Sequence, residues 1–499
     1  MAAHRLVRAG WRVLLLERGD PVPRGPRCAE PSATLEFMPC RDSRSAYRVD
    51  SGGRVGSVAG TTCLGGLSVF FGAAAVRWRE ADFVADPETA DRSGACWPFR
   101  YTDLEPYYTE AERLLGVAGD DATDPTRPPR SAPFPQRPAP LFAVSEWLRH
   151  AILDAGATPT PLPLAINYDS SNGRTACTFC RHCDTFACAI GAKNDVETAV
   201  LAPMTGRGLD VRTGAVVTSL AASNGRVTGV RGWDKASRRP FAHAARHVVL
   251  AAGALASPHL LLASGFDRLH PSGRAIGRFL TRHCAAIVEG FCNFRPDPEK
   301  VFHKQLLVLD YYFGDPRARE AVGQRLGSIQ QLTTPPHLLM RAHMPWFLQQ
   351  VPLHGFVEHL SGLLVMAEDE PQACNGVTVD RSDVDPYGMP RLHVSHRYSG
   401  RDLERRRLLV RRAKRILRRG GAWSFYTLDI ETFSHALGTV RMGANGEAPL
   451  DGDCRLRGLQ NLLVVDGSAL PTSAGLNPGL TIAANALRAA DRLVDADSR

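Results

Sequence analysis

Lysine is scarce in this chain of 499 residues: of its 60 basic residues, five are lysine and the remaining 55 are arginine. The net charge of +9 would fit a nucleic-acid-binding protein if the basic residues formed a continuous patch. They are instead scattered along the chain, with one dense cluster between Arg401 and Arg419. The arginine excess resembles a coding bias, and we expect no nucleic-acid partner.

Long apolar runs are also missing from the sequence. No run approaches the ~18–20 residues that a helix needs to span a bilayer, and Met1 is followed by a polar helix rather than by a signal peptide. Twelve cysteines among 499 residues are too few for a disulfide scaffold. The sequence therefore predicts no transmembrane segment and, as written, a cytoplasmic protein, unless an export signal precedes Met1.

A glycine-rich phosphate loop is the third absence. Residues 2–9 are expected to form a helix, Gly10 to end it, and residues 12–16 to form a strand that ends at Glu17. In a dinucleotide-binding fold these would be the helix after the phosphate loop and the second strand, whose terminal acid binds ribose hydroxyls. The first strand and its G-x-G-x-x-G loop are not in the sequence. We therefore expect a truncated Rossmann-like unit, although an ordinary βαβ unit produces the same helix–strand pattern.

The clearest chemistry lies near the C-terminus. His435 precedes a glycine-broken turn, and the apolar strand Leu462–Val465 ends in Asp466 and Gly467. The pair Asn477–Pro478 then opens a helix. A strand, a polar loop and a helix N-terminus in this order are typical of a site for an anionic cofactor.

Two earlier segments indicate the same kind of site. Gly65, Gly66 and Ser68 lie among small residues, which allows the backbone to approach a flat or charged ligand, although a tight turn before a core helix is the alternative. The apolar run Val248–Ala251, closed by Gly253, predicts a buried parallel strand. The loop at the carboxyl end of such a strand would face the cofactor.

Four cysteines form a separate cluster with x2, x2 and x4 spacing: Cys177, Cys180, Cys183 and Cys188. The spacing resembles an iron–sulfur loop, although the last gap and the residue after it differ from the ferredoxin pattern. Tetrahedral zinc is a second interpretation, and reduced thiols or local disulfides are a third.

The order of elements predicts an α/β protein with a discontinuous Rossmann-like cofactor-binding domain in residues 1–100, 190–290 and 431–499. Residues 101–189 would supply a helix, a proline-rich lid and the cysteine segment, and residues 291–430 an antiparallel substrate-binding domain. Within the latter, the arginine-rich residues 401–419 have an apolar stripe that is typical of a surface helix, with docking to an acidic partner or a membrane as the alternative.

Three blocks of the sequence, Gly60–Gly72, Gly253–Gly265 and His435–Asn477, together resemble the glucose–methanol–choline (GMC) oxidoreductases, flavoproteins that oxidise alcohols. The runs S-H-A-L-G-T-V-R-M-G and V-V-D-G-S-A-L-P-T-S carry most of the resemblance, which covers nearly the whole chain. The cysteine segment is similar to that of a bacterial dehydrogenase-like branch of this family.

The resemblance implies FAD bound without a covalent link, because Val69, Phe70 and Phe71 stand where some members carry a flavin-linking histidine. It implies that His435 and Asn477 face the flavin as the catalytic pair. The cofactor-binding residues that it implies are Glu17 at the adenosine ribose, Gly65, Gly66 and Ser68 near the pyrophosphate and isoalloxazine, Val217 at the adenine, Asp466 and Gly467 near the ribityl–phosphate portion, and Gly253 and Pro478 beside them.

Such an enzyme would oxidise a CH–OH group of an alcohol, sugar or sterol-like substrate by hydride transfer to flavin N5. The hydroxyl proton needs a base, which His435 is expected to be, and Asn477 could donate to the forming alkoxide without adding charge. The alternatives are a structural role for His435 and a helix N-cap role for Asn477.

The electron acceptor depends on the cysteine segment. An iron–sulfur cluster would pass electrons to a quinone or a cytochrome, whereas without a cluster oxygen becomes the expected acceptor. Two further functions remain as alternatives: an inactive, flavin-free remnant that acts as a binding module, and a non-redox flavin lyase.

Overall fold

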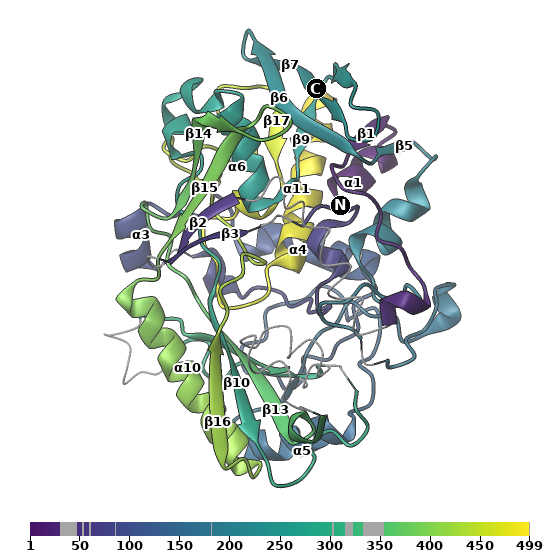
Figure 1. Cartoon of the computed structure of the whole chain (residues 1–499), viewed down its shortest axis with the longest axis vertical. Helices are drawn as coiled ribbons and strands as arrows, with labels where there is room; N and C mark the ends of the chain where they lie inside the picture. The colour runs from purple at the N-terminus through teal and green to yellow at the C-terminus, as the bar shows by residue number, and fades with distance from the viewer. Residues whose placement is uncertain are drawn as a thin grey trace.

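The computed structural model describes residues 1–29, 47–51, 54–58, 61–84, 86–180, 182–301, 304–314, 323–332 and 354–498. The molecule is an α/β protein whose elements gather at two ends of its long axis (Figure 1). Short parallel strand pairs and a long C-terminal helix lie at the upper end of this view, and a larger antiparallel sheet lies at the lower end. The expected fold class, a Rossmann-like body with a separate antiparallel sheet, is confirmed.

The N-terminal elements follow the sequence prediction. Helix α1 (Ala2–Arg8) is followed by strand β1 (Val13–Leu16), which pairs in parallel with β5 (Leu209–Arg212). A second parallel pair joins β9 (Val248–Leu250) to β17 (Leu462–Val464). The predicted strand at residues 248–251 is thus confirmed as parallel, although only its last residue, Leu250, is fully buried.

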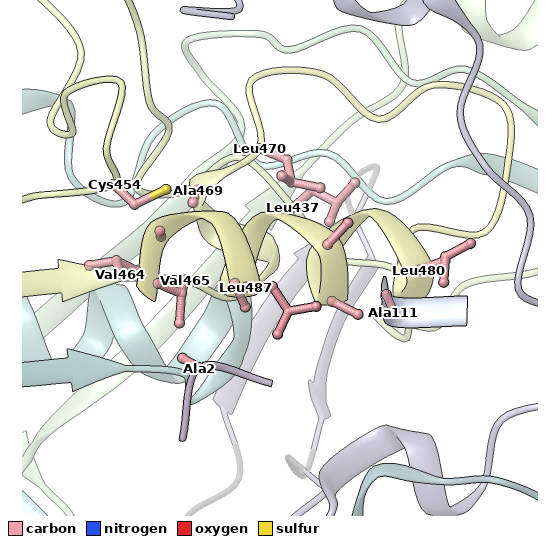
Figure 2. Packing of buried hydrophobic residues seen from close by; sticks show 14 of the residues in the cluster. Ala2, Ala111, Leu437, Cys454, Val464, Val465, Ala469, Leu470, Leu480 and Leu487 are labelled. Atoms are coloured by element: carbon pink, nitrogen blue, oxygen red, sulfur yellow. The ribbon is translucent and has the colours of Figure 1, made fainter. Parts of the chain in front are cut away.

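The helix predicted after Asn477–Pro478 is α11 (Gly479–Asp497), which forms the centre of the upper core. Figure 2 shows Leu480 and Leu487 of this helix among buried residues from distant parts of the chain, including Ala2 and Leu437. Helix α4 (Tyr101–Leu114) packs against α11. Burial of this apolar face fixes the first turn of α11, and with it the loop that leads into the helix.

An antiparallel meander and one helix complete the upper end. The meander consists of β6 (Ala215–Ser223), β7 (Arg226–Asp234) and β8 (Pro240–His243). Helix α6 (Gly253–Ala263) follows β9 directly and contacts β6.

The lower end is a six-stranded antiparallel sheet. Its strands, in spatial order, are β16 (Ser424–Asp429), β10 (Cys284–Phe291), β13 (Leu360–Ala367), β12 (Gly327–Leu332), β11 (Leu306–Val308) and β4 (Thr160–Pro161). Helices α10 (Gly400–Arg419) and α5 (Ala143–Asp154) pack against it and against each other. The arginine-rich helix buries Leu409, Ala413 and Ile416 on the sheet, so its predicted apolar stripe is confirmed.

Residues 291–430, expected to form one antiparallel domain, do not all join the six-stranded sheet. Strands β14 (Gly376–Val384) and β15 (Pro390–His396) lie outside it. They form a four-stranded sheet with β2 (Tyr47–Ser51) and β3 (Arg54–Val58), in which β15 runs parallel to β2. An alternating sequence can predict a strand, but it carries no information on a partner more than 300 residues away in the sequence.

The described part of the chain also contains the short helices α3 (Pro87–Ser93) and α9 (His354–Val357). None of the helices in these residues is long and apolar enough to cross a membrane.

Candidate active site

His435 lies in the segment after β16, and its side chain is half-buried. Close backbone packing holds this segment: the N–H of Gly438 donates to the carbonyl of Gly467 at 3.1 Å. Gly438 has a φ of +87°, and a Cβ there would lie 2.5 Å from the carbonyl oxygen of Phe279. A glycine is therefore required at position 438, because only a residue without a side chain lets the backbone after His435 pass this close to Phe279.

A second histidine, which the sequence analysis did not predict, contacts His435. Nδ1 of His283 lies 3.0 Å from Nδ1 of His435, and Nε2 of His283 lies 3.0 Å from the carbonyl oxygen of Ser473. The side chain of His283 is buried at the start of β10. Its sequence context, T-R-H-C, contains no spacing that links it to His435, 152 residues later.

Asn477 lies four residues after Ser473 in the same segment. Its Oδ1 accepts a hydrogen bond of 2.6 Å from Nε2 of Gln330 on β12. The amide nitrogen Nδ2 is thus the group of Asn477 left to donate to a substrate oxygen. The N-cap alternative was wrong, because α11 begins one residue later than expected and Pro478 occupies the cap position.

The electrostatic environment keeps His435 neutral. Burial lowers the pKa of His435 to about 3, and the nearby His283 and Lys304 add to the effect. Nζ of Lys304 pairs with Oδ2 of Asp184 at 2.6 Å. A Cβ on Gly72 would lie 2.4 Å from Cε of Lys304, so this ion pair lies directly beside the glycine segment. Neither Lys304 nor Asp184 carries a motif that could have identified it in the sequence.

Glu17 lies at the end of β1, as predicted. Its Oε1 accepts a hydrogen bond of 2.8 Å from the N–H of Gly19. Burial raises the pKa of Glu17 to about 7, against the lowering effect of hydrogen bonds from the backbone of Gly19 and Arg18. A desolvated carboxyl group at this position fits a role in binding hydroxyl groups.

Gly65 and Gly66 lead into a 3-10 turn at Gly66–Val69, with φ values of +89° and +56°. A Cβ on Gly65 would lie 2.9 Å from side-chain atoms of Val69 and Glu197, whereas a Cβ on Gly66 would meet no atom within 4 Å. The hydroxyl of Ser68 donates to the carbonyl of Gly65 and accepts from the N–H of Val196. The segment is a tight turn, as one interpretation of the sequence expected. At Gly66 the backbone is also open, as a close approach to a ligand would require. Gly60 lies outside the described residues.

Asp466 connects the ends of the two upper parallel strands. Its Oδ2 accepts from the N–H of Gly253 and the hydroxyl of Ser257, and its Oδ1 accepts from the N–H and the hydroxyl of Ser468. Both carboxylate oxygens are thus occupied within the chain, and the neighbouring Gly467 is buried. Val217 is half-buried on β6, where the pairing with β7 is shifted by a bulge.

The structure does not support a metal site in the cysteine segment. Cys177, Cys180, Cys183 and Cys188 are unbridged, and no three His, Cys, Asp or Glu side chains in the described residues are grouped so that they could hold a metal ion. Burial raises the pKa of Cys177 to about 11 and that of Cys183 to about 12, so both are protonated thiols at neutral pH in the protein without a bound metal. Reduced thiols are the alternative that agrees with this arrangement.

A buried lysine organises the segment instead. Nζ of Lys193 donates to three carbonyl oxygens, those of Phe71, Cys183 and Phe186, at 2.6–2.9 Å. It therefore ties the cysteine segment to the strip of chain that follows the Gly65–Gly66 turn.

The parallel strand pairs, the desolvated acid at a strand end and the histidine next to an antiparallel sheet fit an oxidoreductase that acts on hydroxyl groups. Sequence comparison identifies the family: two models described as GMC oxidoreductase match residues 50–285 and 371–486, and the chain belongs to this family. The protein is an alcohol-oxidising enzyme, and its family implies FAD. Glu17 and the open backbone at Gly66 fit the ribose and the flat or charged parts of that cofactor.

Two curated relatives match almost the whole chain. The 6'''-hydroxyparomomycin C oxidase of Streptomyces lividus is 30% identical over 508 residues, covering 98% of this chain and 88% of that protein. The paromamine 6'-oxidase of Streptomyces fradiae is 31% identical over 514 residues, with the same two coverages of 98% and 88%. Among solved structures, a formate oxidase variant from Aspergillus oryzae RIB40, studied for FAD modification, has a TM-score of 0.69 at 17% identity, covering 99% of this chain and 96% of that one.

Proposed function

We propose that this enzyme oxidises the CH–OH group of a sugar-type alcohol, and that His435 takes the hydroxyl proton while Asn477 donates to the same oxygen. One observation carries the proposal: His435 bonds His283, whose Nε2 lies 3.0 Å from the carbonyl oxygen of Ser473, four residues before Asn477. Burial lowers the pKa of His435, which favours the neutral ring, the form that can accept a proton. Since Oδ1 of Asn477 already accepts from Gln330, its Nδ2 is oriented as a donor.

FAD, when bound, supplies the acceptor for the hydride that leaves the substrate carbon. We propose that Glu17 holds its adenosine ribose, that Gly65 and Gly66 admit its flat or charged parts, and that Val217 contacts the adenine. Asp466 uses its carboxylate within the chain, so we assign it to holding the loops at Gly253 and Gly467 in place beside the cofactor. Pro478 fixes the start of α11 next to the same loops.

The proposal favours a sugar-type substrate over a sterol. The surroundings of the pair are polar: Gln330 bonds Asn477, and Lys304, whose charge acts on His435, pairs with Asp184. Polar surroundings suit a polyhydroxylated molecule better than a steroid ring. The names of the two relatives, oxidases of paromamine and of 6'''-hydroxyparomomycin C, support the same choice.

We propose oxygen as the electron acceptor. In the described residues of the cysteine segment, no side chains are grouped so that they could hold a metal ion, and both relatives are named as oxidases. Hydrogen peroxide should form in step with substrate oxidation in an oxygenated assay. Turnover with an artificial quinone but not with oxygen would exclude this acceptor.

The base assignment is tested with His435→Ala in the flavin-loaded chain. The rate of flavin bleaching by substrate in anaerobic stopped-flow should fall by about 10²-fold or more, the usual scale for loss of an acid–base group. His150→Ala, which changes an exposed histidine on α5, should leave the rate unchanged. A rate close to that of the wild type in the His435 variant would reject the assignment, and a chain that purifies colourless after flavin addition would favour the flavin-free alternative.

A further inference from the structure

His283 contacts His435 through a hydrogen bond whose direction follows from the bond of His283 to the carbonyl oxygen of Ser473. We infer that His283 is a positioning residue for the reaction proposed above, and that it fixes which nitrogen of His435 carries the proton. The inference rests on the proposed function for its catalytic consequence, but its structural content, the tautomer of His435, can be tested without any reaction.

The position of the proton on His283 follows from its contact with Ser473. Nε2 of His283 lies 3.0 Å from the carbonyl oxygen of Ser473, and a carbonyl oxygen can only accept. Nε2 of His283 therefore carries a proton. A neutral imidazole has a single N–H, so Nδ1 of His283 presents a lone pair toward His435.

The bond between the two rings then has a fixed direction. Nδ1 of His435, 3.0 Å away, must donate its proton to Nδ1 of His283. The ring planes stand at 85° with centroids 5.0 Å apart, as expected for an edge-on contact between ring nitrogens rather than a stack. His435 is therefore protonated on Nδ1, and its Nε2 carries the lone pair that can accept the substrate proton.

The neutral state of His283 depends on the groups around it. Burial lowers its pKa, while its bond to Ser473 and the charges of Asp369 and Glu368 act in the opposite direction. The positive charge of Lys304 lowers the pKa of His435 and so disfavours protonation of that ring.

The protein holds His283 in a conformation that it would not adopt by itself. Its φ is +68°, in the left-handed region that non-glycine residues rarely occupy. The hydroxyl of Tyr398 donates to the carbonyl of His283 at 2.8 Å. At 2% exposure, the side chain cannot contact a substrate itself, so it acts through His435.

The acceptor carbonyl is anchored as well. The hydroxyl of Ser473 accepts from the N–H of Asp369 at 2.9 Å and donates to the carbonyl of Asp369 at 3.0 Å. The carboxylate of Asp369 bonds His396 at 2.8 Å and the N–H of Arg282 at 2.7 Å. The chain from His435 through His283 to Ser473 thus ends in a buried network on β15 and the strand ends of the lower sheet.

This arrangement has a consequence for the proton transfer. When the substrate O–H bond breaks and Nε2 of His435 gains the proton, His435 becomes an imidazolium. Its Nδ1–H then donates to His283 as a charge-assisted hydrogen bond, which is stronger than the neutral one. His283 therefore holds the ring of His435 in one orientation before and after the proton transfer.

The direct test is the tautomer of His435 in the purified chain, read by two-bond ¹H–¹⁵N correlation after selective labelling of histidine. The signals of His435 are assigned by comparison with His435→Gln. We expect a proton on Nδ1 and none on Nε2. A proton on Nε2 of His435 in the wild-type protein would overturn the inference, whether or not flavin is bound.

The catalytic test compares His283→Leu with His283→Gln in the flavin-loaded chain. In the serine-protease triad, loss of the group that fixes the histidine tautomer lowers kcat by about 10⁴-fold. His283 is neutral, so we expect a smaller loss of about 10²-fold in kcat for His283→Leu, with KM changed by less than about threefold. Glutamine can accept from His435 and donate to Ser473, so His283→Gln should recover at least about tenfold of that loss.

His259→Gln is the matched control, because His259 is also buried and also bonds a backbone carbonyl, that of Pro390, but has no contact with His435. It should react at the wild-type rate. A wild-type rate in His283→Leu, together with a slow His435→Ala, would overturn the inference and leave the proposed function standing. A wild-type rate in His435→Ala would overturn the proposed function, whereas the tautomer measurement would still decide the role of His283 in the pair.

Discussion

The cofactor side and the substrate side of this enzyme treat buried polar groups in opposite ways. On the cofactor side, Asp466 accepts four hydrogen bonds and has no oxygen left over. On the substrate side, His435 and Asn477 each use one polar atom within the protein and keep one for a ligand. A fully bonded group gives the scaffold its rigidity, whereas a half-bonded group is oriented and still reactive.

Asp466→Ala should have the largest effect, and it should act on stability. The substitution leaves the N–H of Gly253 and the hydroxyl of Ser257 without their acceptor at a buried site. We expect the free energy of unfolding in urea to fall by about 3–5 kcal/mol. Asp497→Ala, which removes an exposed partner of Arg246, should cost less than about 1 kcal/mol. Equal losses in the two variants would contradict the scaffold role of Asp466.

Asn477→Asp should instead act on catalysis. The new side chain keeps an oxygen for Gln330 but loses the Nδ2 donor. We expect kcat to fall by about 10²-fold, equivalent to about 2.7 kcal/mol in the activation barrier, while the thermal midpoint stays within a few degrees. A variant with unchanged kcat would show that the donor of Asn477 is not used in the reaction.

The pH dependence of stability tests the neutral state of His435. Its pKa is about 3 in the folded chain, against about 6.5 when unfolded. Between pH 6.5 and pH 3 the unfolded state therefore binds a proton that the folded state does not bind. The contribution of neutral His435 to the free energy of unfolding is complete above pH 6.5 and is lost as the pH falls toward 3. Between pH 8 and pH 5, the wild type should lose about 2 kcal/mol more than His435→Gln. Parallel curves for the two proteins would contradict the lowered pKa.

Cys180→Ser should have the smallest effect. Its thiol is exposed and unbridged, and the segment around it is held by Lys193 rather than by a metal. The free energy of unfolding should change by less than about 0.5 kcal/mol, and the visible spectrum should stay the same. Loss of absorbance or of bound iron in this variant would restore the iron–sulfur interpretation.

The sequence predicted those helices and strands whose signals lie within a short stretch of the chain. The helix and strand that lead to Glu17, the parallel strand before Gly253 and the helix after Asn477 each have a complete signal within about 20 residues. His283, Gln330 and Lys304 come from separate strands or loops of the lower end and meet the site only through sheet pairing. No spacing in one sequence records such pairing, and for the same reason β14 and β15 were expected within one antiparallel domain with the rest of residues 291–430.

The cysteine segment shows how spacing can predict a bound ion where none is needed. Three carbonyl oxygens converge on the ammonium group of Lys193 much as they would converge on a coordinated cation. This cation is part of the polypeptide, so it is present once in every molecule, cannot dissociate and does not respond to chelators. The loop beside the active site is therefore held in part by a charge that belongs to the chain itself.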